Sequence, residues 1–352
     1  MQRLTRMDGL RGLLAIYVML GHALPLTDVP PWVTAMFGHG EAAVDLFFAL
    51  SGLVVINGVQ RCKGKFWLFM EARARRLLPV YFLVLAAAVA LLMLGDPLAA
   101  LPWVGAPARD IFSPGLPPEV GWHVAAHVLL VHGLIPRGVL PYAWVSLLGP
   151  AWSLSAEWQF YVLLGLLAPK RLAFLAYGLL AAGVFYQFAP LPAAWQFSRA
   201  FLPSAAPWFA LGLASHIWLR GGGWGVFGVC LAGACALEST QSLGRTLIPL
   251  LWGVALIANS ARWGAVLETP VARYLGAISY PLYLVNVPCA AALALLIGPM
   301  AEGNAARFTL VWLPCTLALS VAAAAALHHL VARRFTEEQN FFLPVIARPL
   351  RQ

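Results

Sequence analysis

Arg11 and His22 stand eleven residues apart in the first apolar stretch of the chain, MDGLRGLLAIYVMLGHALP. In a helix, eleven steps of about 100° return both side chains to within roughly 20° of one face, about 16 Å apart along the axis. A guanidinium and an imidazole are expensive to bury in lipid, so such residues usually face a bundle interior or a wet cavity. The spacing therefore predicts a functional helix. The alternative is a basic flank followed by a structural, hydrogen-bonded histidine.

Two carboxylates, Asp45 and Glu157, fall inside apolar stretches that we expect to run inward from the outer surface. If these stretches cross the bilayer, both carboxylates lie at about the depth of His22. Intramembrane carboxylates commonly mark functional sites. Either could hold the imidazole in one tautomer and stabilise its charged form, which leaves the other nitrogen as a general base. Ser153, four residues before Glu157, could hydrogen-bond it. The alternative is that both carboxylates lie close enough to water to need no partner.

Four arginines, Arg11, Arg73, Arg75 and Arg76, group at the opposite, cytoplasmic level. Guanidinium groups beside a cavity mouth bind phosphates through paired hydrogen bonds. The cluster therefore predicts a phosphorylated donor that enters from the cytosol. The alternative is that these charges meet anionic lipid. Asp8, three residues before Arg11, is a candidate partner for it.

The composition is that of a polytopic membrane protein. Of the 352 residues, 61% are hydrophobic and 11% are charged, with a mean hydropathy of +0.79, whereas soluble domains carry about 25% charged residues. The net charge of +9 then reflects loops on one side of a bilayer and does not indicate a nucleic-acid partner. The five scattered cysteines and the histidines at positions 123, 127 and 132 match no ligand set, so no metal is expected.

Hydropathy predicts an all-α bundle of about ten transmembrane helices, because a span of about 20 apolar residues crosses a bilayer. The expected spans are 9–26, 41–59, 78–95, 152–169, 172–189, 203–219, 223–238, 246–260, 274–297 and 308–331. Segment 121–134 is too short to span and is expected to be re-entrant or interfacial. Of the 23 Lys and Arg residues, 18 lie on the side of the N-terminus and 5 on the other, which places both termini in the cytoplasm. We expect a transmembrane domain over 1–335 and a short cytoplasmic tail over 336–352.

Five ordered motifs resemble those of the family-3 integral-membrane acyltransferases. The motifs are MDGLRGLLAIYVMLGH with its Arg-x10-His spacing, DLFFALSGLVV at 45–55, RARRLLPVYF at 73–82, AWSLSAEWQFYVLL at 151–164 and ISYPLYLV at 278–285. By position, the residues that match the family motifs are Arg11, His22, Asp45, Arg73, Arg76 and Glu157. The chain departs from the family in two places: Asn286 stands where many members have histidine, and FTEEQNFF at 335–342 lacks the usual Glu-x-Pro ending.

The resemblance implies transfer of an acyl group, often acetyl, from cytoplasmic acyl-CoA to a hydroxyl of a carbohydrate or glycolipid at the outer face of a bacterial inner membrane. In this hypothesis the donor phosphates lie near Arg73, Arg75 and Arg76, and the pantetheine arm passes Arg11. His22 deprotonates the acceptor, which typically contributes about 10²–10⁴-fold. Substrate binding is assigned to the motif side chains Trp152, Ser153, Tyr161 and Tyr280. A covalent acyl-enzyme needs an additional step.

Two other functions fit the same composition. Apolar helices with buried charges would also serve a transporter or flippase for lipid-linked sugars. Such a protein commonly has broken helices in matching positions of two halves, and the sequence shows no such symmetry. In a non-catalytic scaffold, Arg11 and His22 would be freely replaceable.

Overall fold

Apolar runs in this chain become helices because a backbone in lipid has to satisfy its own hydrogen bonds. The computed structural model describes residues 5–167, 171–259 and 261–335. That part of the chain contains helices and turns but no strand, which confirms the all-α prediction. The predicted tail 336–352, Lys170 and the first four residues lie outside the described residues.

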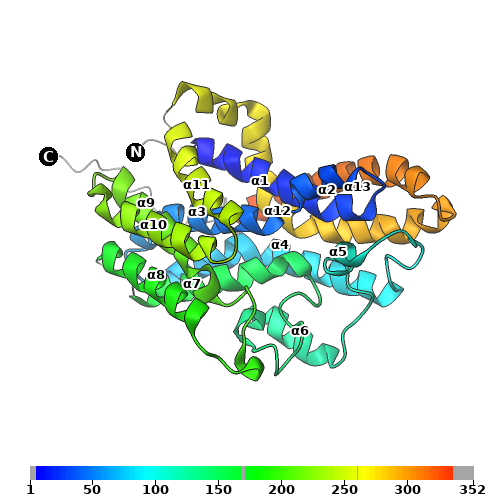
Figure 1. The fold of residues 1–352 in the computed structure, drawn as a ribbon, viewed down its shortest axis with the longest axis horizontal. Coiled ribbons are helices and arrows are strands. Elements are labelled where there is room, and N and C mark those ends of the chain that lie inside the picture. Colours follow the sequence, from blue (N-terminus) through cyan, green and yellow to red (C-terminus); the bar gives the residue numbers. More distant parts are fainter. Residues whose placement is uncertain (1–4, 168–170, 260, 336–352) are drawn as a thin grey trace.

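Most helices follow one another with short connections, but longer ones lie at 95–151, where two short helices stand between long ones, at 189–201 and between α11 and α12. They are α1 (Thr5–Ala23), α2 (Pro31–Phe37), α3 (Gly40–Arg61), α4 (Phe66–Leu94), α5 (Ala106–Arg109), α6 (Val120–Val128), α7 (Trp152–Leu167), α8 (Leu172–Phe188), α9 (Leu202–Leu219), α10 (Trp224–Ser239), α11 (Leu247–Ala258), α12 (Pro270–Ile297) and α13 (Ala305–Leu327). In Figure 1, α1, α3, α4 and α12 run along the long dimension of the molecule, and α8 to α10 lie together on one side.

Five helical segments are long and apolar enough to cross a membrane: Arg6–Leu26, Pro31–Arg61, Phe66–Leu94, Pro270–Ile297 and Ala305–Phe335. A sixth is added if Leu243–Ala258, which contains α11, and Arg262–Glu268, bent by 91° relative to each other, count as one span. These helices make the chain a multi-pass membrane protein.

The ten-span count is not confirmed, because the other predicted spans coincide with shorter helices. Helices α7 to α11 hold 16, 17, 18, 16 and 12 residues. A 16-residue helix rises about 24 Å, against about 30 Å of hydrocarbon. The full span count and the cytoplasmic placement of both termini therefore stay predictions. Helix α6 has nine residues and is too short to cross, as expected for segment 121–134.

Glycines allow the closest helix contacts in the bundle. A Cβ added at Gly12 of α1 would lie 2.6 Å from the backbone nitrogen of Gly276 in α12. Gly52 of α3 and Gly212 of α9 face each other in the same way, and a Cβ at Gly52 would lie 2.6 Å from a carbonyl oxygen of α9. Small residues let helix backbones approach in membranes. These two contacts fix the helices that carry Arg11 and Ser51, which line the site described below.

Three buried histidines hold the loop of residues 135–151 against α6 and the turn that follows it. The Nδ1 atom of His123 lies 2.7 Å from the Ser146 hydroxyl. The rings of His127 and His132 stack with centroids 4.2 Å apart, and each contacts a backbone carbonyl of the loop, at 2.9 and 3.1 Å. These contacts make the histidines structural. Across the described ranges, no group of three or more His, Cys, Asp or Glu side chains is placed to hold a metal ion.

Acidification is expected to loosen this loop, because burial lowers the pKa of His132 to about 4. The unfolded histidine titrates near 6.5, so between these values the unfolded state binds the proton and the folded state does not. Stability is therefore full above about pH 6.5 and falls towards pH 4, by about 3 kcal/mol at most. Limited proteolysis within residues 120–151 should accelerate as pH falls through this window. The variant His132→Gln should show a flatter dependence, and equal pH profiles for both proteins would contradict this assignment.

Candidate active site

A cavity of about 1120 Å³ opens among α1, α3, α4, α7, α9 and α12. Pockets for drug-sized ligands hold roughly 300–1,000 Å³, so this one accommodates a larger molecule. Its charged lining consists of five arginines and two carboxylates: Arg11, Arg61, Arg73, Arg76, Arg220, Asp8 and Glu157. The excess of positive charge favours an anionic ligand.

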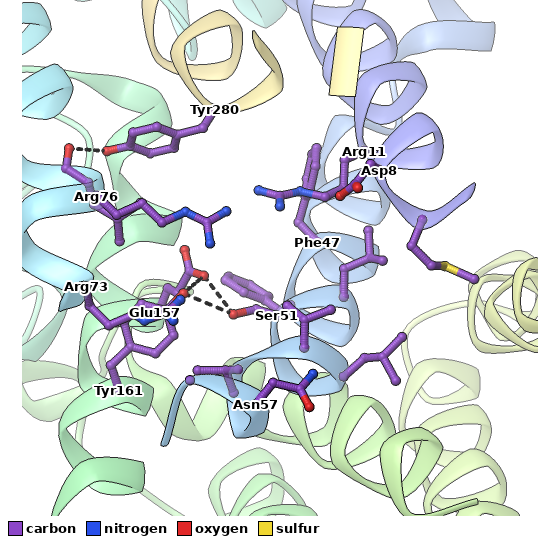
Figure 2. A pocket seen from close by; sticks show the side chains of 18 of the residues that line it. Asp8, Arg11, Phe47, Ser51, Asn57, Arg73, Arg76, Glu157, Tyr161 and Tyr280 are labelled. Atoms are coloured by element: carbon purple, nitrogen blue, oxygen red, sulfur yellow. Dashed lines mark hydrogen bonds between the residues drawn. The ribbon is translucent and has the colours of Figure 1, made fainter. Parts of the chain in front are cut away.

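Glu157 lies at the centre of a hydrogen-bonded group in this cavity. Its Oε1 atom accepts hydrogen bonds from the Ser51 hydroxyl, at 2.7 Å, and from the Tyr161 hydroxyl one helical turn further along α7. Figure 2 shows the carboxylate directed towards the arginines. The prediction that Glu157 lies beside His22 and bonds Ser153 is wrong, because the structure turns Glu157 towards α3 and α4. Ser153 donates instead to Tyr283, at 3.0 Å, at another part of the wall.

Arg73 is held in the wall by aromatic rings. Its Cζ atom lies 5.4 Å from the ring centroid of Phe69 and 5.6 Å from that of Tyr161, which is within the range of cation–π attraction. Gly58 leaves room for the guanidinium, since a Cβ there would lie 2.5 Å from Nη2. The buried Nε atom has no hydrogen-bond partner in the part of the chain described. The wall therefore fixes the side chain without using all of its donors.

Arg11 and Arg76 extend from opposite walls towards the centre of the cavity (Figure 2). Arg11 interacts electrostatically with Arg76, Glu157 and Asp8, so the predicted pairing with Asp8 is one of several charge contacts. Within residues 5–167, 171–259 and 261–335, no hydrogen bond occupies either guanidinium. Two guanidinium groups that lie close together and have free N–H donors can bind an anion between them.

Arg75 does not belong to this cluster, contrary to the sequence-based prediction. It pairs with Glu71 at 2.6 Å on an exposed face of α4 and does not line the cavity. The reason is helix geometry: Arg73 and Arg76, three residues apart, share a face, whereas Arg75 is turned away from it. In its place the structure adds Arg61 and Arg220, and Arg220 donates to Asn57 at 3.0 Å.

Three of the four predicted substrate-binding side chains, Ser153, Tyr161 and Tyr280, line the cavity. The Tyr280 hydroxyl donates to the backbone carbonyl of Leu77 at 2.8 Å. Trp152 is not part of the lining. Its ring lies beneath the Arg199 guanidinium, 5.6 Å from Cζ to the ring centroid.

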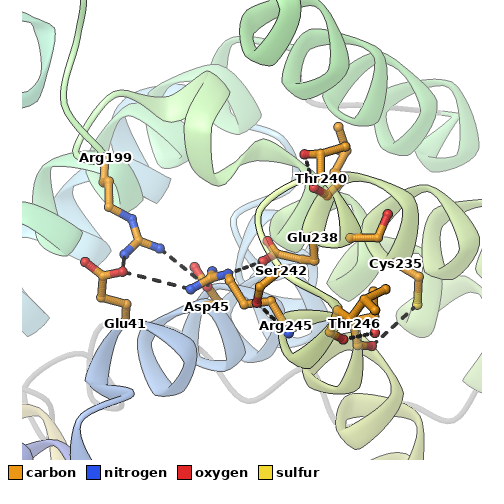
Figure 3. A network of polar contacts seen from close by, with 12 residues as sticks. Glu41, Asp45, Arg199, Cys235, Glu238, Thr240, Ser242, Arg245 and Thr246 are labelled. Atoms are coloured by element: carbon orange, nitrogen blue, oxygen red, sulfur yellow. Dashed lines mark hydrogen bonds and ion pairs between the residues drawn. The ribbon is translucent and has the colours of Figure 1, made fainter.

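Asp45 lies in a separate network of ion pairs, shown in Figure 3. Its Oδ2 atom is 3.0 Å from Arg245 and 3.6 Å from Arg199. Glu238 pairs with Arg245 at 2.5 Å, and Glu41 pairs with Arg199. The prediction that Asp45 orients His22 is wrong, because these arginines reach α3 from the segment before α9 and from the α10–α11 turn. Removing one partner of a buried pair is strongly destabilising, so Asp45 ties these elements together.

His22 contacts a residue that the sequence argument left without a role. Its Nδ1 atom lies 2.7 Å from Oδ1 of Asn286 in α12. Asn286 follows Tyr283 by three residues, and Tyr283 lines the cavity. His22 therefore lies next to the turn of α12 that follows Tyr283, and it is half-buried.

The motif residues thus fall into one cavity, a histidine–asparagine pair next to it and an ion-pair network around Asp45 that does not line it. The chain matches the sequence model of a protein family whose description is "Acyltransferase domain". The match covers residues 4–329, nearly the whole chain. The chain belongs to this acyltransferase family. The acyltransferase is also 31% identical to "Protein 2 in picA locus" of Rhizobium radiobacter over 168 residues, which is 44% of this chain and 78% of that protein. No solved structure matches the acyltransferase.

Several residues of the acyltransferase cavity were missed by sequence reasoning. Ser51, Arg61 and Arg220 line the cavity, but none of them was assigned a role from the sequence. Arg61 ends α3, and its charge at the end of an apolar stretch is the one sequence signal that could have pointed to it. Arg220 follows the end of α9, and no spacing in the sequence links it to α3.

Proposed function

We propose that this membrane acyltransferase uses acyl-CoA, in the simplest case acetyl-CoA, as the donor for a hydroxyl of a carbohydrate or glycolipid. The observation that supports this most strongly is the arginine-lined cavity, in which Arg11 and Arg76 have unoccupied donors and Arg73 is fixed beside them. Guanidinium groups bind phosphates through paired, charge-assisted hydrogen bonds. Under the predicted topology this cavity opens towards the cytoplasm of a bacterial inner membrane, where acyl-CoA is available.

The pantetheine arm would then run from the arginines towards Ser153 and Tyr283, the end of the cavity nearest to His22. His22 removes the proton from the acceptor hydroxyl as its oxygen attacks the thioester carbonyl. The new C–O bond forms, the C–S bond breaks, and the proton passes from His22 to the departing CoA thiolate. Such general-base help typically contributes about 10²–10⁴-fold.

In this mechanism Glu157 has a positioning role. It orients Ser51 and Tyr161 through hydrogen bonds and offsets part of the positive charge of the arginines. Tyr161 in turn supports Arg73. The carboxylate therefore keeps three arginines close together before the donor arrives.

Binding of labelled CoA to the purified protein tests this function. CoA should bind with an affinity that falls as salt is added, because phosphate contacts dominate. Unlabelled CoA should compete, whereas pantetheine, which lacks the phosphates, should not. Absence of CoA binding in a folded preparation would contradict acyl-CoA as the donor and favour a transporter of lipid-linked sugars, which has no need of CoA.

A further inference from the structure

The side-chain amide of Asn286 is oriented by its own helix. Its Nδ2 atom donates to the backbone carbonyls of Leu282, at 3.1 Å, and Tyr283, at 2.7 Å. A flipped amide would place its oxygen against these two carbonyl oxygens, where no hydrogen bond is possible. The amide oxygen therefore has to face His22.

This orientation determines where the proton of His22 lies. An amide oxygen only accepts hydrogen bonds, so Nδ1 of His22, 2.7 Å away, must be the donor. In a neutral imidazole the other nitrogen then carries the lone pair. In the chain as described, Nε2 of His22 makes no hydrogen bond. It is also absent from the buried side-chain atoms that lack a partner, so this atom is accessible and free to accept a proton.

We propose that Asn286 is a positioning residue that fixes His22 in the tautomer protonated at Nδ1, so that Nε2 is the basic atom. The catalytic consequence rests on the proposed function, whereas the tautomer itself does not. An asparagine can fix this tautomer because its side-chain nitrogen already donates to two helix carbonyls, which leaves only the oxygen to face His22. With its nitrogen facing the ring, the amide would impose the opposite tautomer, which lowers turnover about 10⁴-fold in a serine-protease triad. The amide differs from a carboxylate in one respect: it fixes the proton without adding negative charge beside the imidazolium.

The tautomer can be measured directly. In protein with ¹⁵N-labelled histidine rings, the His22 signals are those lost in His22→Gln. At about pH 8.5, where histidine is ordinarily neutral, the wild type should show a protonated Nδ1 and an unprotonated Nε2. In Asn286→Ala the form protonated at Nε2 should appear. A wild-type His22 protonated at Nε2 would overturn the proposal, and so would an unchanged tautomer in a folded Asn286→Ala protein.

The catalytic consequence is tested by a double-mutant cycle. Asn286→Ala should lower the turnover number about tenfold, leaving the KM for acetyl-CoA unchanged, because only the general-base step is impaired. In a His22→Ala background the same change should cost nothing more. An equal loss in both backgrounds would show that Asn286 supports the fold and would overturn its positioning role. Absence of transfer by the wild type would instead contradict the acyltransferase proposal, and the tautomer would still be decided by the spectra.

Discussion

The variant His22→Ala is expected to transfer acyl groups about 10²–10⁴-fold more slowly than the wild type. In the structure the ring has a fixed partner at Nδ1, Asn286, which follows the cavity residue Tyr283 by three positions on α12. Removing it deletes the base that accepts the hydroxyl proton and leaves the arginine lining in place. Turnover should therefore fall while CoA binding is retained.

His39→Ala is the matched control for this variant. His39 is an exposed residue directly before α3, so its loss removes a histidine without touching the site, and transfer should continue at the wild-type rate. Transfer by His22→Ala within a few-fold of the wild type would contradict the general-base role. Loss of CoA binding in His22→Ala would show instead that the substitution disturbs the bundle.

The variants Arg76→Ala and Arg75→Ala are expected to behave oppositely although the residues are adjacent. Arg76 extends into the cavity with free donors, whereas Arg75 pairs with Glu71 on an exposed face of α4. A hydrogen bond to a charged group contributes about 1.5–3 kcal/mol, so Arg76→Ala should lower kcat/KM for acyl-CoA by about 10–150-fold. Arg75→Ala should leave it within about twofold, because exposed ion pairs contribute little.

Steady-state kinetics with varied acetyl-CoA, at matched protein levels, measure this difference. The effect of Arg76→Ala should appear mainly in KM, because the lost contact is to a part of the donor remote from the thioester. Equal, small effects of both substitutions would contradict the placement of the donor phosphates in this cavity. Equal, large effects would indicate that the basic surface as a whole attracts the donor.

The helices themselves could be predicted well from hydropathy. The expected spans at 152–169, 172–189 and 203–219 begin and end within a few residues of α7, α8 and α9. Whether these helices cross the bilayer could not be predicted in the same way, because an apolar window does not distinguish a full span from a shorter buried helix.

The arginine cavity was only partly predictable. Helical periodicity brings Arg73 and Arg76 to one face and would have excluded Arg75, so that error could have been avoided from the sequence. The pairing of His22 with Asp45 or Glu157 failed for another reason. The depth of a residue in a bilayer does not say on which side of its helix the side chain lies. In the structure Glu157 lies on the side of α3 and α4, and Asp45 lies towards Arg245. The role of Asn286 needed both the α1–α12 contact and its local backbone bonds.

Transfer of labelled acetyl from acetyl-CoA is the most direct test of the central claim, that this chain is an acyltransferase with an acyl-CoA donor. Membranes that contain the wild-type protein should move label into a saccharide-bearing or glycolipid fraction, and membranes with His22→Ala or Arg76→Ala at equal protein level should move far less. No label above that of membranes lacking the protein, across a panel of acyl-CoA donors and carbohydrate acceptors, would contradict it.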